Sequence, residues 1–375
     1  MDSAADARAG VAANPACGPA HETATMSLPR LDRLVDAVQT NCHIADASHA
    51  ADLTLCTYLM QMREFFRWEH GLAPMLPLPH DEVGTWLARR ESLWASLEGE
   101  AFAPVPLPGG PLDPFDATAV NAELRPFGLV YGAGYVSPGR ANFFLGELQR
   151  VHVRDGIELL FSGCEHARGL VAPPAALAGS TVMLRKESFA RWVWERFEAW
   201  MMKRQQGAFK AALDCYGFEA LGPEAVGRLI EGEFETLALH ELGEFRAGEQ
   251  LGPDWQGLRG LVSRRADLYV RSARDHLADC LVTLPTLLRA DAGASLHFWF
   301  ANLEGVRAQL FPRLSHAYAA WVAGDAGAAL RGAIVDGCVH WGRVCNELAA
   351  LYRELGGDAA PRIEARATSP DQVLR

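Results

Sequence analysis

Three segments of the chain carry a histidine and a carboxylate one helical turn apart in apolar surroundings. Spacings of i,i+3 and i,i+4 place both side chains of a pair on one face of a helix. Imidazole and carboxylate ligands together suit iron, manganese or zinc rather than a thiolate site. We therefore predict that three pairs converge on a metal centre: His49 with Asp52, His240 with Glu244, and His276 with Asp279.

The pair His276 and Asp279 lies in a run from Asp267 to Leu288 whose apolar residues cover nearly the whole helix circumference. Such a helix is buried, and an uncompensated polar group there costs roughly 2 to 7 kcal/mol. A cation, an arginine, a hydrogen-bond network or water must therefore satisfy Asp279. Asp275 has a local partner in Arg271, four residues earlier, and we expect it at a wet edge.

His240 and Glu244 lie in a similar apolar run, and helical spacing places Glu233 on the same face. Glu241 is expected to point about 100° away from that face. A glycine inside a helix lowers the stability of the helix by about 1 kcal/mol relative to alanine, and Gly243 is such a glycine. Its missing side chain predicts that another group approaches closely there.

The N-terminal pair belongs to a ladder in which His43 and Asp46 precede His49 and Asp52 at three-residue steps. Each step drifts by about 60° on a helix with 3.6 residues per turn, so only neighbouring members can share a site. We predict that His49 and Asp52 are ligands, that Asp46 is a reserve ligand, and that His43 is exposed.

Six ligands suit two bridged metal ions better than one, as in helical di-iron proteins. The inventory is similar to that of haem-oxygenase-like di-metal oxidases, in ligand types and not in spacing or order. In that resemblance the three carboxylates and three histidines of the pairs would all be ligands. We predict a metal-dependent enzyme, a helical di-iron or di-manganese oxidase or oxygenase that acts on a small molecule.

Two alternatives stay open. The string His240-Glu241-Leu242-Gly243-Glu244 departs from the H-E-x-x-H zinc hydrolase motif in its last residue. There, His240 and Glu244 would bind zinc and Glu241 would be the catalytic general base. In the other alternative the protein is a non-catalytic binding or scaffold protein, whose pairs form a buried salt-bridge network with arginines such as Arg63, Arg67, Arg271 and Arg274.

Composition excludes several classes of protein. The chain has 375 residues, 49% of them hydrophobic, and a formal net charge of -11, which favours a globular protein and argues against a nucleic-acid partner. No apolar run reaches the roughly 18 residues that span a bilayer, and the first 25 residues lack the core of a signal peptide. Eight cysteines without a C-x-x-C motif are interpreted as buried thiols in a reducing cytoplasm. We expect a cytoplasmic protein without a membrane partner, and the sequence carries no signal for an oligomeric state.

No nucleotide cofactor is expected either. Gly132-Ala133-Gly134 lacks the third glycine and the following helix of a dinucleotide-binding loop. We interpret these residues as strand glycines near a bulge or a close contact.

The elements that must position the pairs are mostly helical. Apolar periodicity and breaks predict helices over about 27–70, 81–97, 187–215, 223–248, 256–290, 295–320 and 324–355. Residues rich in β-formers predict strands over 129–136, 142–153, 157–161 and 181–185, with a turn at Asp155-Gly156. The proline-rich segment 102–114 is expected to be an irregular connector.

The predicted fold class is therefore α+β and mostly helical, with a C-terminal helical bundle and a small antiparallel β-sheet inserted in the N-terminal part. We divide the chain into a disordered extension over 1–26, an N-terminal domain over 27–185, a C-terminal helical domain over 186–356 and a flexible tail over 357–375.

Four strings carry a resemblance to a known family: His43 to Glu69, Asn142 to Leu148 (NFFLGEL), His240 to Glu249 (HELGEFRAGE) and Arg274 to Pro285 (RDHLADCLVTLP). They resemble an uncharacterised bacterial protein family with a locus-tag label, whose N-terminal and C-terminal parts are treated as separate domains of unknown function. The resemblance covers about residues 27 to 355 and implies no activity.

Overall fold

The computed structural model describes residues 31–137 and 139–375, so the predicted extension over 1–26 lies outside the described residues. The fold is α+β and mostly helical, with a two-stranded antiparallel sheet and a five-stranded sheet, which confirms the predicted fold class. The chain forms two compact units. Unit 1 holds the described residues up to Val153 together with Glu158–Pro174 and Met183–Glu198, and unit 2 holds Arg154–Ile157, Ala175–Val182 and Ala199–Arg375.

Unit 1 begins with two helices where the sequence predicted one. Helix α1 (Leu31–His49) is followed by a short 3-10 turn (Ala50–Asp52), and helix α2 (Leu55–Glu69) starts anew. Thr54 has an extended backbone, and its side chain accepts a hydrogen bond from the backbone N–H of Thr57. A threonine in this position caps a helix N-terminus. A new helix therefore begins after Thr54, although the apolar periodicity continues across the break. Helix α3 (His80–Leu97) follows within one residue of its predicted start.

The proline-rich connector was expected to be irregular, and this expectation is wrong. Strands β1 (Val105–Leu107) and β2 (Gly110–Leu112) form a two-stranded antiparallel sheet in which Pro106 lies opposite Pro111. Both strands of such a sheet are edge strands, where a proline without an N–H is tolerated. Helix α4 (Ala117–Leu124) comes next, and the side chain of Asp116 caps it.

The five strands of the larger sheet lie in the order β3-β4-β5-β7-β6. Their bounds are β3 (Leu129–Ser137), β4 (Arg140–Arg154), β5 (Ile157–Arg168), β6 (Ala175–Ala178) and β7 (Thr181–Arg185). Asp155 and Gly156 join β4 to β5 with φ angles of 53° and 81°, the left-handed conformation that a tight hairpin turn needs. The interpretation of Gly132 as a site of close contact is confirmed, because a Cβ there would lie 2.5 Å from the Phe144 ring.

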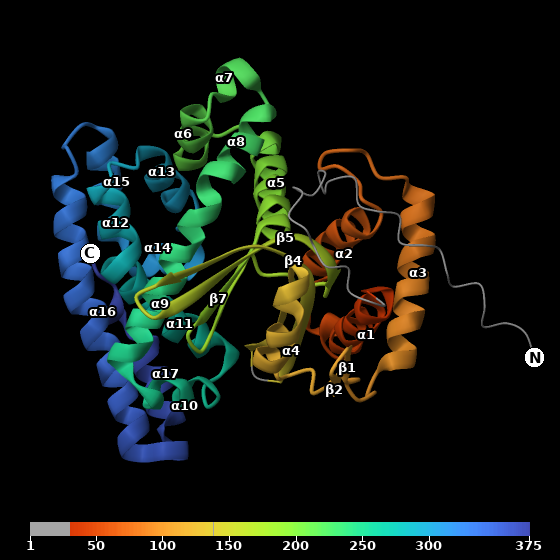
Figure 1. The fold of residues 1–375 in the computed structure, drawn as a ribbon. Helices are drawn as coiled ribbons and strands as arrows, with labels where there is room; N and C mark the ends of the chain where they lie inside the picture. The colour runs from red at the N-terminus through yellow and green to blue at the C-terminus, as the bar shows by residue number, and fades with distance from the viewer. Residues whose placement is uncertain (1–30, 138) are drawn as a thin grey trace, which may run out of the picture. The chain divides into compact units, whose positions relative to one another are not determined.

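After the sheet the chain is helical to its end (Figure 1). Of the five helices predicted here, only the last is continuous, and each of the other four is divided by one or two short breaks. The bounds are α5 (Lys186–Lys203), α6 (Ala208–Cys215), α7 (Phe218–Leu221), α8 (Glu224–Glu233), α9 (Leu237–Leu251), α10 (Pro253–Arg259), α11 (Arg264–Ala278), α12 (Leu284–Arg289), α13 (Gly293–Ala301), α14 (Gly305–Leu310), α15 (Pro312–Val322) and α16 (Ala328–Leu355).

The last residues form a folded element where the sequence predicted a flexible tail. Helix α17 (Ala360–Ala367) buries Ile363 and Ala367 completely in the core of unit 2. The backbone N–H of Leu374 donates a hydrogen bond of 2.8 Å to the carbonyl of Leu310. These contacts hold the end of the chain against unit 2.

Six of the seven cysteines in the described part of the chain are free thiols, and the burial of some of them differs from the expectation. Cys42, Cys280 and Cys345 are buried as predicted, whereas Cys56 and Cys215 are exposed. Cys164 is disulfide-bonded, so the prediction that all the cysteines are thiols is wrong for it.

Helices α9 and α11 approach each other very closely in unit 2. A Cβ on Gly243 would lie 2.5 Å from the backbone carbonyl oxygen of Ala278. This identifies the group that the sequence predicted to approach Gly243. A side chain at residue 243 would push apart the two helices that carry the candidate site.

Directly after Ala278 the helix widens into a π-helical segment over Asp279–Thr283. Pro285 follows in the first turn of α12, and a proline ring clashes with the carbonyl four residues earlier in an α-helix. A π-turn relieves that clash, and such turns are frequent at functional sites.

We predict that Gly243→Ala lowers the free energy of unfolding by about 1 to 3 kcal/mol. The added methyl group would collide with the backbone of α11, which would have to move to make room for it. The measurement is urea unfolding followed by circular dichroism. Gly248→Ala is the matched control on the same helix, since nothing lies within 4 Å of a Cβ there. That control should be neutral or stabilising by up to about 1 kcal/mol. Equal effects of the two changes would contradict the close approach.

Candidate functional site

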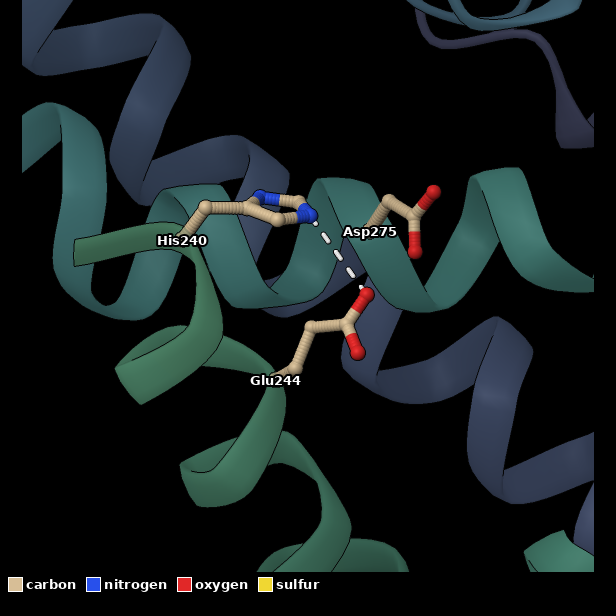
Figure 2. Close-up of side chains that lie close together, drawn as sticks. All are labelled: His240, Glu244 and Asp275. Atoms are coloured by element: carbon tan, nitrogen blue, oxygen red, sulfur yellow. Dashed lines mark ion pairs between the residues drawn. The ribbon is translucent and has the colours of Figure 1, made fainter. Parts of the chain in front are cut away.

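Two helices of unit 2 bring a histidine and two carboxylates together. His240 and Glu244 lie on α9, and Asp275 lies on α11 (Figure 2). His240 Nε2 is 3.4 Å from Glu244 Oε1. One ligand atom from each of the three residues lies within 4.8 Å of the other two. The i,i+4 pair was predicted from the sequence, and the third member comes from the neighbouring helix.

The second imidazole nitrogen of His240 faces Asp279. His240 Nδ1 lies 2.9 Å from Asp279 Oδ1, and the Asp279 side chain is only 1% exposed. Arg307 of α14 forms an ion pair with the other carboxylate oxygen of Asp279. Asp279, predicted as a metal ligand, thus contacts the Nδ1 side of the imidazole and holds the orientation of the ring.

Arg274 contacts both carboxylates of the candidate site, those of Glu244 and Asp275. Its Nη2 forms an ion pair with Glu244 Oε1 and lies 3.2 Å from Asp275 Oδ1. The expected partner of Asp275, Arg271, instead pairs with Asp267 at 2.7 Å. The salt-bridge alternative from the sequence named Arg274 among its arginines, and the ion pairs of Arg274 agree with that alternative.

The charges of this cluster shift the pKa values of its members in opposite directions. Burial alone would lower the pKa of His240, but the carboxylates of Asp279 and Glu244 outweigh burial and raise it well above its ordinary value. Burial would raise the pKa of Glu244, but the hydrogen bond from His240 and the charge of Arg274 lower it to about 2. Burial likewise opposes the charges of His240 and Arg307, which hold the pKa of Asp279 well below its usual range.

Glu241 interacts electrostatically with the same cluster, and its direction about 100° away from His240 and Glu244 stays a prediction. Burial, followed by the charge of Glu244, raises the pKa of Glu241 to about 7, while the charges of His240 and Arg274 lower it. A carboxyl group with a pKa near neutrality can accept or donate a proton under physiological conditions. The structure thus places the predicted general base within electrostatic reach of the predicted ligands.

The contacts of His276 are with groups other than the carboxylates of this cluster. Its Nε2 lies 2.9 Å from the backbone carbonyl oxygen of Arg307, and its ring stacks on Trp341 with centroids 4.8 Å apart. Burial and the charge of Arg307 lower the pKa of His276 to about 3, so the ring is neutral. The structure gives this predicted ligand a packing and hydrogen-bonding role.

His49 and Asp52 lie in unit 1 and pair with each other. His49 Nδ1 is 3.3 Å from Asp52 Oδ2, and the Asp52 side chain is 51% exposed. The other imidazole nitrogen of His49 is 2.9 Å from the carbonyl oxygen of Gly139. The convergence of this pair with the pairs of unit 2 stays a prediction.

The structure corrects the expectations for the rest of the N-terminal ladder. His43, predicted to be exposed, is buried, and its Nε2 lies 2.6 Å from Arg90 Nη1. Burial, then Arg90, lowers the pKa of His43 to about 3. Asp46, the reserve ligand, accepts hydrogen bonds of 3.1 and 2.9 Å from the backbone N–H of Leu170.

Glu233, expected on the face of His240 and Glu244, is separated from them by a break in the helix. Helix α8 ends at Glu233 and a 3-10 turn (Phe234–Thr236) precedes α9. The Glu233 carboxylate instead accepts hydrogen bonds of 2.7 Å from Tyr216 and 3.0 Å from Ser295. It plays no part in the cluster around His240.

Sequence reasoning missed two members of the site, Asp275 and Arg307. Asp275 lies four residues before Asp279, so helical spacing could have placed it on the same side of α11. Arg307 lies on a separate short helix, 28 residues after Asp279. No local pattern could have connected those two residues.

Comparisons with known proteins place the chain in a family. Residues 33–185 match the model of the N-terminal domain of a family of unknown function (DUF6866), and residues 190–370 match the model of its C-terminal domain. The chain belongs to this family. No curated protein and no solved structure matches the chain. None of the helices in the described part of the chain is long and apolar enough to cross a membrane.

The buried pair His240 and Asp279 predicts a specific pH dependence of stability. The contribution of Asp279 is present above its unfolded pKa of about 3.9 and is lost as the pH falls through its lower folded pKa. The contribution of His240 is full below its unfolded pKa of about 6.5 and is lost as the pH rises through its higher folded pKa. We therefore expect this pair to stabilise the fold most between about pH 4 and 6.5.

Asp279→Asn should lower the free energy of unfolding by about 3 to 5 kcal/mol near pH 5.5, because it leaves buried charges without their partner. Urea unfolding over a pH series measures the effect. Asp336→Asn is the control, since Asp336 and Arg313 form an ion pair in which both side chains are 45% exposed. That change should cost less than about 1 kcal/mol. A loss for Asp279→Asn no larger than that of the control would contradict the role of Asp279.

Proposed function

We propose that this protein is a metal-dependent enzyme whose single divalent ion is bound by His240, Glu244 and Asp275. The observation that supports this most is the contact of His240 Nδ1 with Asp279 Oδ1 at 2.9 Å. Histidines that bind metals usually donate their second ring N–H to a carboxylate, which fixes the ring and makes the free nitrogen a better ligand. In this arrangement Nε2 is the free nitrogen, and it faces Glu244.

The residues fit such an ion in type and spacing. One imidazole and two carboxylates suit iron, manganese or zinc. Bonds of about 2.0 to 2.2 Å allow two ligands on opposite sides of an ion to lie about 4.2 Å apart. Three ligand atoms spaced evenly around one ion at this bond length lie about 3.6 Å apart, so atoms separated by the observed limit of 4.8 Å would each move inward by about 0.7 Å. The His240 side chain is 29% exposed, so the imidazole is not sealed off from solvent.

Such an ion, when bound, polarises a substrate oxygen or lowers the pKa of a water ligand. The residues of the chain supply the rest of the chemistry. Asp279 fixes the tautomer and direction of His240, and Glu241, with its pKa of about 7, accepts the proton that the reaction releases. Iron or manganese would support the predicted oxidation of a small molecule, and zinc would support hydrolysis. A dinuclear centre needs additional bridging carboxylates, so this cluster of one imidazole and two carboxylates suits a single ion.

A second candidate function rests on a specific observation of its own. Arg274 and Arg307 already form ion pairs with the carboxylates of Glu244, Asp275 and Asp279. With His240 protonated, these cations balance the three carboxylates without any metal. In that case the cluster fixes the packing of α9 on α11, and the protein is a non-catalytic binding or scaffold protein.

Metal analysis separates the two functions. We expect purified protein to bind about one equivalent of iron, manganese or zinc, measured by elemental analysis. The protein is purified with a removable tag that contains no histidines, so that the tag itself binds no metal. His240→Ala and Asp275→Asn should abolish this binding. Asp279→Asn should weaken it by about 10- to 100-fold, as outer partners of metal ligands do. Asp267→Asn is the control on α11, and it should retain the metal.

A folded protein without metal, which also fails to bind manganese, iron or zinc in a titration, would contradict the enzyme and support the scaffold. Folding of each variant is checked by circular dichroism, so that loss of metal is not confused with loss of structure.

Arg274 provides an independent prediction. Its guanidinium contacts the same carboxylates that would bind the ion, and a like charge that close repels an ion. Arg274→Gln should therefore raise the affinity for manganese, measured by calorimetric titration. Arg271→Gln, which removes an ion pair on the same helix, should leave that affinity unchanged. If the cluster is a salt-bridge network alone, Arg274→Gln lowers stability and creates no saturable manganese binding.

A further inference from the structure

Two cysteine thiols face each other in unit 2, next to the charge cluster. Cys280 is the second residue of the π-helical segment, directly after Asp279. Cys338 lies on the long helix α16 (Figure 1). The two residues are 58 positions apart in the chain, and a hydrogen bond joins their thiols.

A glycine on α16 makes this contact possible. A Cβ on Gly337 would lie 2.6 Å from Cys280 Sγ, so the sulfur occupies the space that the missing side chain leaves. The π-helical segment packs directly on α16. Cys280 Sγ therefore lies against the backbone of α16 beside Cys338.

The environments of the two thiols differ in a way that favours oxidation. Cys338 is half-buried and can be reached from solvent, whereas Cys280 is only 2% exposed. The hydrogen bond from Cys280 lowers the pKa of Cys338, and the same contact, with burial, raises the pKa of Cys280. Oxidation-sensitive cysteines combine solvent access and a lowered thiol pKa with an adjacent resolving thiol, and Cys338 has these features.

We propose that Cys338 and Cys280 are a redox modification site, in which a hydroperoxide oxidises Cys338 and Cys280 resolves the product as an intramolecular disulfide. This inference is independent of the proposed metal chemistry.

The reaction balances with the peroxide as oxidant. The thiolate of Cys338 attacks one peroxide oxygen and the O–O bond breaks, which gives a sulfenic acid on Cys338 and a hydroxide or alkoxide. That anion takes up the proton that Cys338 lost when it ionised and leaves as water or an alcohol. The sulfur of Cys280 then attacks the sulfur of Cys338. The S–S bond forms as the S–O bond breaks, and the departing hydroxide takes the thiol proton and leaves as water. The two sulfurs together lose two electrons, which the peroxide gains.

The location of the disulfide connects it to the candidate site. Cys280 directly follows Asp279, whose carboxylate contacts both His240 and Arg307. A bond from Cys280 to α16 would fix the turn that carries this carboxylate. Oxidation would thus act on the residue that orients His240.

Peptide mapping of the wild-type protein tests the proposal. Reduced protein is treated with hydrogen peroxide, free thiols are alkylated, and trypsin is added. Cleavage at arginines places Cys280 alone in peptide 275–289 and Cys338 alone in peptide 332–343. We expect these two peptides to appear as one disulfide-linked species, two hydrogens lighter than their sum, and to separate again after treatment with dithiothreitol.

Variants identify the order of the steps. In Cys280→Ser the oxidation should stop at the sulfenic acid of Cys338, which dimedone labels, and in Cys338→Ser the Cys280 thiol should stay reduced. Cys215→Ser, which removes an exposed cysteine, should leave the linked species unchanged. The proposal is overturned if folded wild-type protein, with Cys338 oxidised, yields no linked species. It is equally overturned if the link forms as readily in urea-unfolded protein.

Discussion

The burial of one carboxylate, that of Asp279, constrains the whole centre of unit 2. An ionised carboxylate in the interior costs several kcal/mol unless it has partners of opposite charge. Asp279 has two, His240 from α9 and Arg307 from α14, and it lies at the start of a π-helical segment. The three elements must therefore meet in one arrangement for this charge to be tolerated. The close approach of Gly243 to Ala278 serves the same arrangement, because it lets α9 and α11 come near enough for the contact.

The orientation of His240 follows from this constraint. Since Asp279 occupies Nδ1, the other nitrogen of the ring faces Glu244 and Asp275. Arg274 balances these carboxylates in the absence of an ion. The cluster is thus a self-compensated network in which the imidazole is held by one buried pair, and a cation of the kind proposed above would use the same orientation of the ring. Glu241 lies beside it with a pKa close to neutrality, which is the chemical property a proton acceptor needs.

The candidate site was partly predictable because part of it is local. The spacing of His240 and Glu244 on one helix requires nothing beyond helical geometry. The partners of those residues are not local. Asp279 was recognised as a buried charge in need of compensation, but its compensation by His240 and Arg307 depends on how three helices pack. For His276 the same pattern of spacing had a different outcome, because its ring is held by a backbone carbonyl and by Trp341.

The sequence by itself determined the features that arise from neighbouring residues. It established the mostly helical α+β class, the strands around the Asp155-Gly156 turn and the close approach at Gly243, since periodicity and turn chemistry act over a few positions. Only the tertiary structure decided where some long apolar runs break, as after Glu233, and that the C-terminal residues pack as α17. It also decided which charges neutralise one another. Ion pairs form between side chains that packing brings together, and sequence separation carries no information about that proximity.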